Sequence, residues 1–153
     1  MTMYFDVSLI FPKSNDTRIC LLSFLEKEYE LIEGENLASK FGCTKIIVFS
    51  VEEEGAEYDE ICIDFSEQVF HKETFKKEID ELTDFVHHCF KYNPNLKYVL
   101  CSYESNGYLL GGIKELKDFN SGLLKRFPLV YEKKEAFNQP SLQINEDAQD
   151  IFV

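Results

Sequence analysis

The sequence predicts one α+β domain built around an antiparallel sheet, and three observations lead to this fold class. The chain has 153 residues, 44% of them hydrophobic, which is enough to bury one core without disulfides. Stretches in which apolar residues alternate are interspersed with stretches in which they recur about one helical turn apart. Two apolar runs, 44–52 and 60–65, flank an acidic connection, which is typical of a β-hairpin.

The first two predicted elements are a strand and a helix. Apolar residues alternate with polar ones over residues 3–11, which predicts a strand with one buried face that ends at Pro12. Between Thr17 and Leu31 the apolar side chains recur about one helical turn apart, which predicts an amphipathic helix. Residues 32–43 show no sustained period, and we expect a loop there.

The hairpin carries the best fold signal. Its first strand, 44–52, has apolar residues on both faces, which indicates a central strand. Its second strand, 60–65, alternates apolar and polar residues, and the connection EEEGAEYD contains Gly55, which suits a hairpin with a longer loop. We therefore expect these two strands to be the middle pair of a four-stranded sheet.

The second half of the chain begins with the clearest helix, 72–92, which Asn93 and Pro94 end. A strand is predicted next, at 97–103. Two short helices and a small edge strand are predicted beyond it, at 113–119, 122–127 and 129–131. We expect residues 104–153 to be an extension that packs on the 1–103 core, where it either extends the sheet or covers its open face.

The predicted order over residues 1–103 is strand, helix, strand, strand, helix, strand. This is the split βαβ arrangement, and it resembles the ferredoxin-like fold in layout. The resemblance implies an antiparallel sheet with two helices on one face, within a single domain that spans residues 1–153. Because that fold hosts many unrelated functions, the resemblance implies no particular activity.

The net charge of −12 is concentrated in one region. Residues 26–64 hold twelve acidic residues and three lysines, a local charge of −9, whereas residues 71–134 carry a charge of +2. Negative charge repels phosphate and anionic lipid and attracts basic proteins. We therefore expect neither nucleic acid nor a membrane as a partner, and the lack of an apolar run of about 18 residues predicts no membrane span.

The cysteines and the start of the chain indicate a cytoplasmic protein. Five cysteines are an odd number, and none lies in a CxxC pair, so buried thiols in a reducing compartment explain them best. The first residues, MTMYFDVSLIF, have neither a basic leader nor a small-residue cleavage site, and we expect no signal peptide.

Motifs for catalysis or cofactor binding are absent: the sequence has no EF-hand loop, P-loop, GxGxxG or GxSxG. We therefore expect a protein that is not an enzyme and that binds no cofactor. His87, His88 and Cys89 are consecutive on the predicted second helix, where neighbouring side chains diverge by about 100°. At most one of them faces a given site, and we expect Cys89 in the core and His88 on the outer face.

One alternative interpretation is a small enzyme or a ligand-sensing domain with a cleft. Cys43 and His71 would form a nucleophilic pair if folding brought them together. Asp64 and Glu60 lie two residues apart on one strand face and, with Glu52 from the neighbouring strand, would bind a divalent cation. A further alternative is a scaffold subunit that oligomerises through an exposed sheet face.

The acidic connection of the hairpin predicts a binding surface for a basic protein, with Tyr58 as a rigid aromatic anchor within the charge. The alternative is a solvated loop that aids solubility. The residues expected to contact the partner are Glu33, Glu35, Glu52, Glu53, Glu54, Glu57, Tyr58, Asp59 and Glu60. In charge and size the chain is similar to bacterial immunity proteins, which neutralise a toxin, often a basic nuclease. That likeness implies an inhibitor that acts by direct binding.

Overall fold

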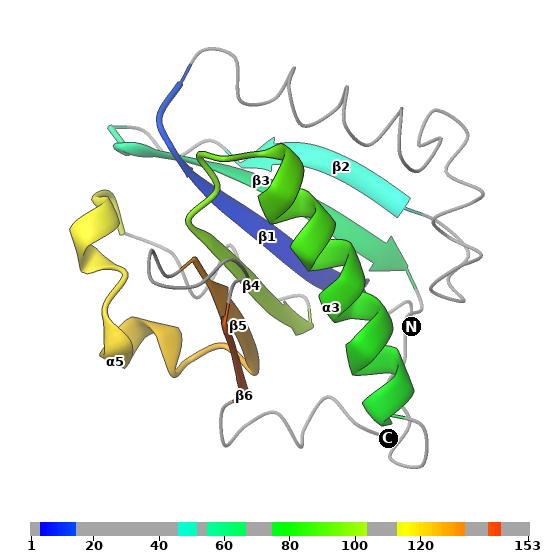
Figure 1. Ribbon diagram of the computed structural model, residues 1–153. Helices are drawn as coiled ribbons and strands as arrows, with labels where there is room; N and C mark the ends of the chain where they lie inside the picture. Colours follow the sequence, from blue (N-terminus) through cyan, green and yellow to red (C-terminus); the bar gives the residue numbers. More distant parts are fainter. Residues whose placement is uncertain are drawn as a thin grey trace.

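The computed structural model describes residues 4–14, 46–51, 55–66, 75–103, 113–133 and 141–144. Strands from these ranges form a mixed α/β architecture around one antiparallel sheet of six strands, in the order β2-β3-β1-β4-β5-β6 (Figure 1). The strands are β1 (Tyr4–Pro12), β2 (Ile46–Val51), β3 (Tyr58–Ser66), β4 (Tyr98–Tyr103), β5 (Leu129–Glu132) and β6 (Ser141–Ile144).

The helix α3 (Phe75–Tyr92) crosses one face of the sheet (Figure 1). The predicted apolar stripe is confirmed over its described side chains, because Leu82, Val86 and Cys89 are at most 2% exposed and pack against the sheet. The facing residues of β1, Val7 and Leu9 among them, are fully buried. The alternation over residues 3–11 therefore predicted this contact face correctly from Phe5 onward.

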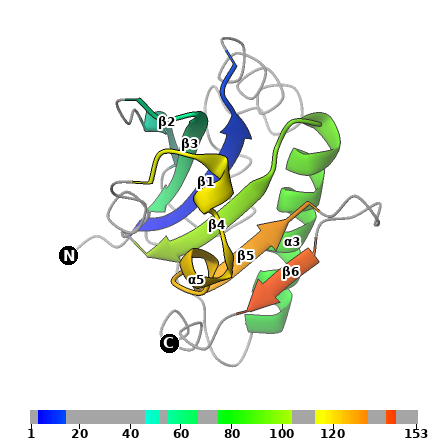
Figure 2. The same cartoon turned by 90° about the vertical axis from the view of Figure 1, so that its left-hand side faces the viewer.

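The opposite face of the sheet is also covered, in part by residues 113–127. These include the short 3-10 helix η1 (Leu116–Asp118) and the helix α5 (Ser121–Leu124), which lie on the side of the sheet away from α3 (Figure 2). Phe119, Phe127 and neighbouring apolar residues form a second core cluster with Ile10 of β1 and Leu100 of β4. The two covered faces make this a three-layer arrangement.

One prediction about an exposed sheet face is therefore wrong. The sequence predicted one buried face for β1, but Ser8 and Ile10 on its second face are fully buried and Asp6 is 9% exposed. Residues 99–102 of β4 are likewise buried on both faces, so the exposed sheet face that the scaffold alternative needs does not lie at β1 or at this part of β4. The polar positions of an alternating strand lie on the sheet face opposite its apolar positions. That second face can also be buried, as it is here.

The described residues do not confirm the ferredoxin-like arrangement. The first predicted helix, 17–31, lies outside the described ranges. The six-stranded order is not that of a four-stranded ferredoxin-like sheet, because β4 lies between β1 and β5 instead of at an edge. The predicted central strand β2 is at the end of the described sheet and pairs there with β3. Apolar residues on both faces of a strand are typical of a buried strand. They do not determine how many strands pair with its two edges.

The described part of residues 104–153 contributes both to the sheet and to the layer that covers its second face. It extends the sheet through β5 and β6, and it covers the second face through residues 113–127. The predicted edge strand at 129–131 corresponds to β5, which is an internal strand because β6 pairs with it. Among the described helices, none is long and apolar enough to cross a membrane.

Candidate functional site

A group of polar side chains lies on the second face of the sheet, the face away from α3. We call it the polar cluster, and its members come from β1, β3 and β4: Asp6, Ser8, Glu60, Cys62, Asp64 and Ser102. Strand alternation places them there, because Asp6 and Ser8 share a face with Ile10 of the second core cluster. All of them except Asp64 are at most 9% exposed, so this is a polar interior rather than a solvated face.

The strand register brings two carboxylates together. Asp6 of β1 lies directly opposite Asp64 of β3, and on its other side it lies opposite Ser102 of β4. Directly opposite residues on one face of an antiparallel pair have Cβ atoms about 4.5–5.5 Å apart, and like charges in such pairs destabilise a sheet. Asp6 and Asp64 are therefore an electrostatically costly pair.

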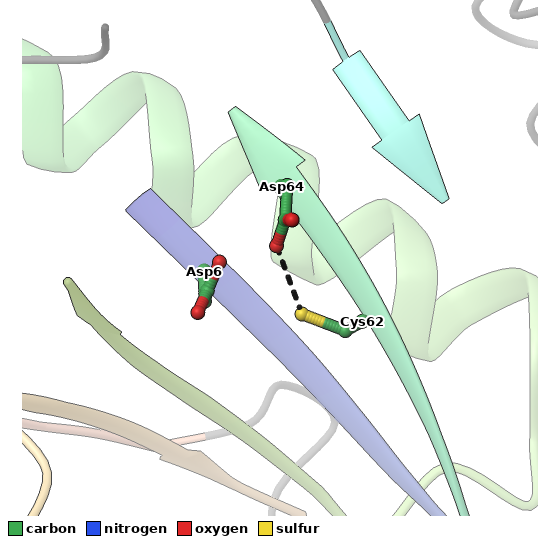
Figure 3. A group of neighbouring side chains, drawn as sticks. All are labelled: Asp6, Cys62 and Asp64. Carbon is green, nitrogen blue, oxygen red and sulfur yellow. Dashed lines mark hydrogen bonds between the residues drawn. The ribbon is translucent and has the colours of Figure 1, made fainter. Parts of the chain in front are cut away.

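Cys62 completes a group of potential metal ligands with these two residues. One ligand atom each from Asp6, Cys62 and Asp64 lies within 4.8 Å of the others (Figure 3). The Cys62 thiol donates a hydrogen bond to Oδ1 of Asp64 at 3.2 Å. Burial, followed by the negative charges of Asp6 and Asp64, raises the pKa of Cys62 above its usual range, so the thiol is neutral near pH 7.

This geometry suits a cation that prefers oxygen ligands. Two carboxylates supply hard oxygen atoms from two rigid strands, which is the chemistry that divalent cations such as Ca²⁺ or Mn²⁺ use. A softer ion such as Zn²⁺ would also use the Cys62 sulfur, but only after the thiol had lost its proton. Within the described ranges, this is the one group of three such side chains close enough to hold a metal ion.

The sequence-based prediction of the cation ligands was partly different. It grouped Asp64 with Glu60 and Glu52, whereas the ligand atoms that lie near Asp64 belong to Asp6 and Cys62. Glu60 instead accepts a hydrogen bond from the Ser8 hydroxyl at 2.9 Å, and Glu52 lies outside the described residues. The alternating pattern shows which face Asp6 shares. It does not show that Asp6 lies opposite Asp64, because strand register depends on residues far apart in the chain.

The hairpin end, residues 55–60, is the described part of the predicted partner-binding surface. Glu57 is exposed there, and Asp59 is half-buried and accepts a hydrogen bond from the Ser14 backbone N–H at 2.9 Å. Glu60 is 3% exposed, so it presents almost no surface to a partner, and its contact with one stays a prediction. Acid content in the sequence did not distinguish the solvated carboxylates from the buried one.

Tyr58, the predicted rigid aromatic anchor of the partner surface, is a core residue in this structure. Its side chain is 5% exposed, and its hydroxyl donates a hydrogen bond to the Ile113 carbonyl oxygen at 2.8 Å. Its ring contacts Phe119 edge-on, with 5.1 Å between the centroids. These two contacts link the hairpin end to residues 113–119. A buried tyrosine is stable when its ring packs in the core and its hydroxyl is hydrogen-bonded.

Three lysines surround the turn at Gly55, and the sequence did not predict this arrangement. Lys13 Nζ donates a hydrogen bond to the Ala56 carbonyl oxygen at 3.3 Å. The Lys114 backbone carbonyl oxygen accepts a hydrogen bond from the Glu57 backbone N–H at 2.6 Å, and Lys114 Nζ lies 3.7 Å from where a Cβ at Gly55 would be. The hydrogen bond to Glu115 chiefly raises the pKa of Lys117, and the charge of Glu57 adds to it. Lysines from distant parts of the chain thus lie near the described end of the hairpin.

The remaining predicted residues divide into two groups. Cys89 is 1% exposed and lies in the core while His88 is exposed, which confirms the orientation expected for that part of the helix. The others, namely Glu33, Glu35, Cys43, Glu52, Glu53, Glu54 and His71, lie outside the described residues.

Two candidate sites therefore stand out in the described ranges: the buried polar cluster and the exposed hairpin end. Comparison with family models, with curated proteins and with solved structures finds no match for this chain.

Proposed function

We propose that this chain is an acidic cytoplasmic binding protein that acts without catalysis and occludes a basic protein, such as a toxin or nuclease, in the manner of an immunity protein. The observation that carries the proposal is the exposed carboxylate of Glu57 on a firmly held turn. Glu52, Glu53 and Glu54 precede that turn in the sequence, and the whole chain has a net charge of −12. Charge of this sign speeds the approach of a basic partner.

The way the turn is held supports a role in binding. The Tyr58 hydroxyl and the Glu57 backbone N–H both bond to carbonyl oxygens of residues 113–114. Behind the turn, β3 pairs with both β1 and β2. A surface that is ordered before binding loses less conformational entropy on association, so more of the contact energy appears as affinity.

The lysines around Gly55 make the proposed surface mixed in sign. Lys13, Lys114 and Lys117 offset part of the negative charge of the turn. We therefore infer that Glu57 acts together with Glu52, Glu53 and Glu54, which precede the turn in the sequence, as one local acidic surface.

The test is a charge reversal with a matched control. A pull-down from native cells at low salt, with elution at high salt, identifies the partner, and calorimetry with the two purified proteins measures the affinity. We expect Glu53→Lys/Glu57→Lys to weaken binding at least about tenfold, because repulsion replaces attraction at the contact. Asp80→Lys/Asp84→Lys makes the same change of charge at exposed positions on α3 and should leave the affinity within about twofold.

Two results would contradict this proposal. One is an equal loss of affinity in both double variants, which would indicate an effect of net charge without a specific surface. The other is a partner whose affinity is the same for the wild-type protein and for Glu53→Lys/Glu57→Lys.

A second candidate function is a small ligand-sensing domain that holds a divalent cation at Asp64. The specific observation in its favour is the polar cluster, in which ligand atoms of Asp6, Cys62 and Asp64 lie within 4.8 Å of one another. A bound cation would offset the repulsion between the opposed carboxylates and would thereby stabilise the native sheet.

Thermal unfolding with Ca²⁺, Mn²⁺ or Zn²⁺ as the probe tests this second candidate. An ion at a hundred times its Kd stabilises the native state by about 2.7 kcal/mol, or about 5–10 °C for a chain of this size, and EDTA should reverse the shift. We expect the shift in the wild-type protein and in the exposed control Asp84→Asn. We expect none in Asp6→Asn/Asp64→Asn, and a shift of the same size in that variant would exclude the polar cluster as the site.

We also propose that residues 17–31 form a helix on the same face as α3. That helix would complete a split βαβ unit, the core of the ferredoxin-like layout, inside the larger six-stranded sheet. The apolar residues of 17–31, spaced about one helical turn apart, support this placement. Backbone chemical shifts would identify the helix, and extended shifts over 17–31 would contradict it.

A further inference from the structure

We draw no further inference here: the strongest candidate, the group of lysines Lys13, Lys114 and Lys117 around the turn at Gly55, belongs to the hairpin end already described, and nothing in the described residues shows what covers it.

Discussion

At the scale of single residues, the environment of a side chain decides its role more than its type does. Tyr58 and Glu60 come from the most acidic stretch of the sequence, yet both are buried and hydrogen-bonded. Glu57, from the same stretch, is exposed. The free cysteines show the same dependence, because Cys62, Cys89 and Cys101 are each at most 2% exposed.

Burial makes these three thiols unreactive, which site-resolved alkylation can check. The thiolate is the reactive form, and burial both blocks access and raises the pKa of Cys62, Cys89 and Cys101. We expect iodoacetamide at pH 8 to leave all three unmodified in the native protein and to modify all three in denaturant. Modification of Cys62 in the native state at the rate of a small free thiol would contradict the neutral, buried state derived above.

At the scale of elements, α3 is held to the sheet by its apolar side and by the polar contact between Thr83 and Tyr131. Phe85 and Val86 are fully buried against the sheet, whereas Tyr92 near the end of the helix is 48% exposed. The hydroxyl groups of Thr83 and Tyr131 are 2.8 Å apart and link the helix to β5. Burial raises the pKa of Tyr131 above its usual range, so this hydroxyl keeps its proton at any ordinary pH.

Two substitutions on α3 separate its buried side from its exposed side. Phe85→Ala leaves a cavity beneath the helix and should lower the free energy of unfolding by about 3–5 kcal/mol. Tyr92→Ala removes a comparable ring that is 48% exposed and should cost less than about 1 kcal/mol. Urea unfolding followed by circular dichroism gives both values, and similar losses in the two variants would mean that α3 is not docked as described.

Local patterns could predict α3 and the contact face of β1, because a period of 3.6 or 2 residues is visible within a short window. The order of the strands could not be predicted in the same way, because neither the pairing of β4 with β5 nor that of β5 with β6 leaves a periodic trace. The polar cluster depends on strand register, and register couples residues far apart in the chain. For this reason the sequence indicates Asp64 as a potential ligand but does not indicate Asp6.

At the scale of the whole molecule, basic side chains from distant parts of the chain lie near the hairpin end. Lys13 and Lys114, which contact the hairpin end, and Lys117, which feels the charge of Glu57, come from distant parts of the chain. The net charge of −12 nevertheless remains, and it acts on the molecule as a whole. Excess charge of one sign destabilises a compact state through self-repulsion.

Salt should therefore stabilise this protein. At about 0.1 M ionic strength, counterions largely screen the repulsion between exposed charges that are more than about 10 Å apart. We therefore expect Tm to rise as the sodium chloride concentration increases from about 0.01 to 0.5 M. The Glu115–Lys117 ion pair, at 2.9 Å, is exposed and contributes too little to reverse this trend. Glu53→Lys/Glu57→Lys has four fewer net negative charges and should show a smaller rise, and a fall in Tm with salt would contradict the self-repulsion account.

The position of β1 in the sheet also affects how the chain folds. It is the first described strand, yet its neighbours are β3 and β4, whose residues begin at Tyr58 and Tyr98. Pairing across such separations requires the closure of long loops, which slows folding. During synthesis, β1 emerges long before β4, and we expect the β2–β3 hairpin and α3 to form ahead of it. The centre of the sheet would then be the last part to assemble.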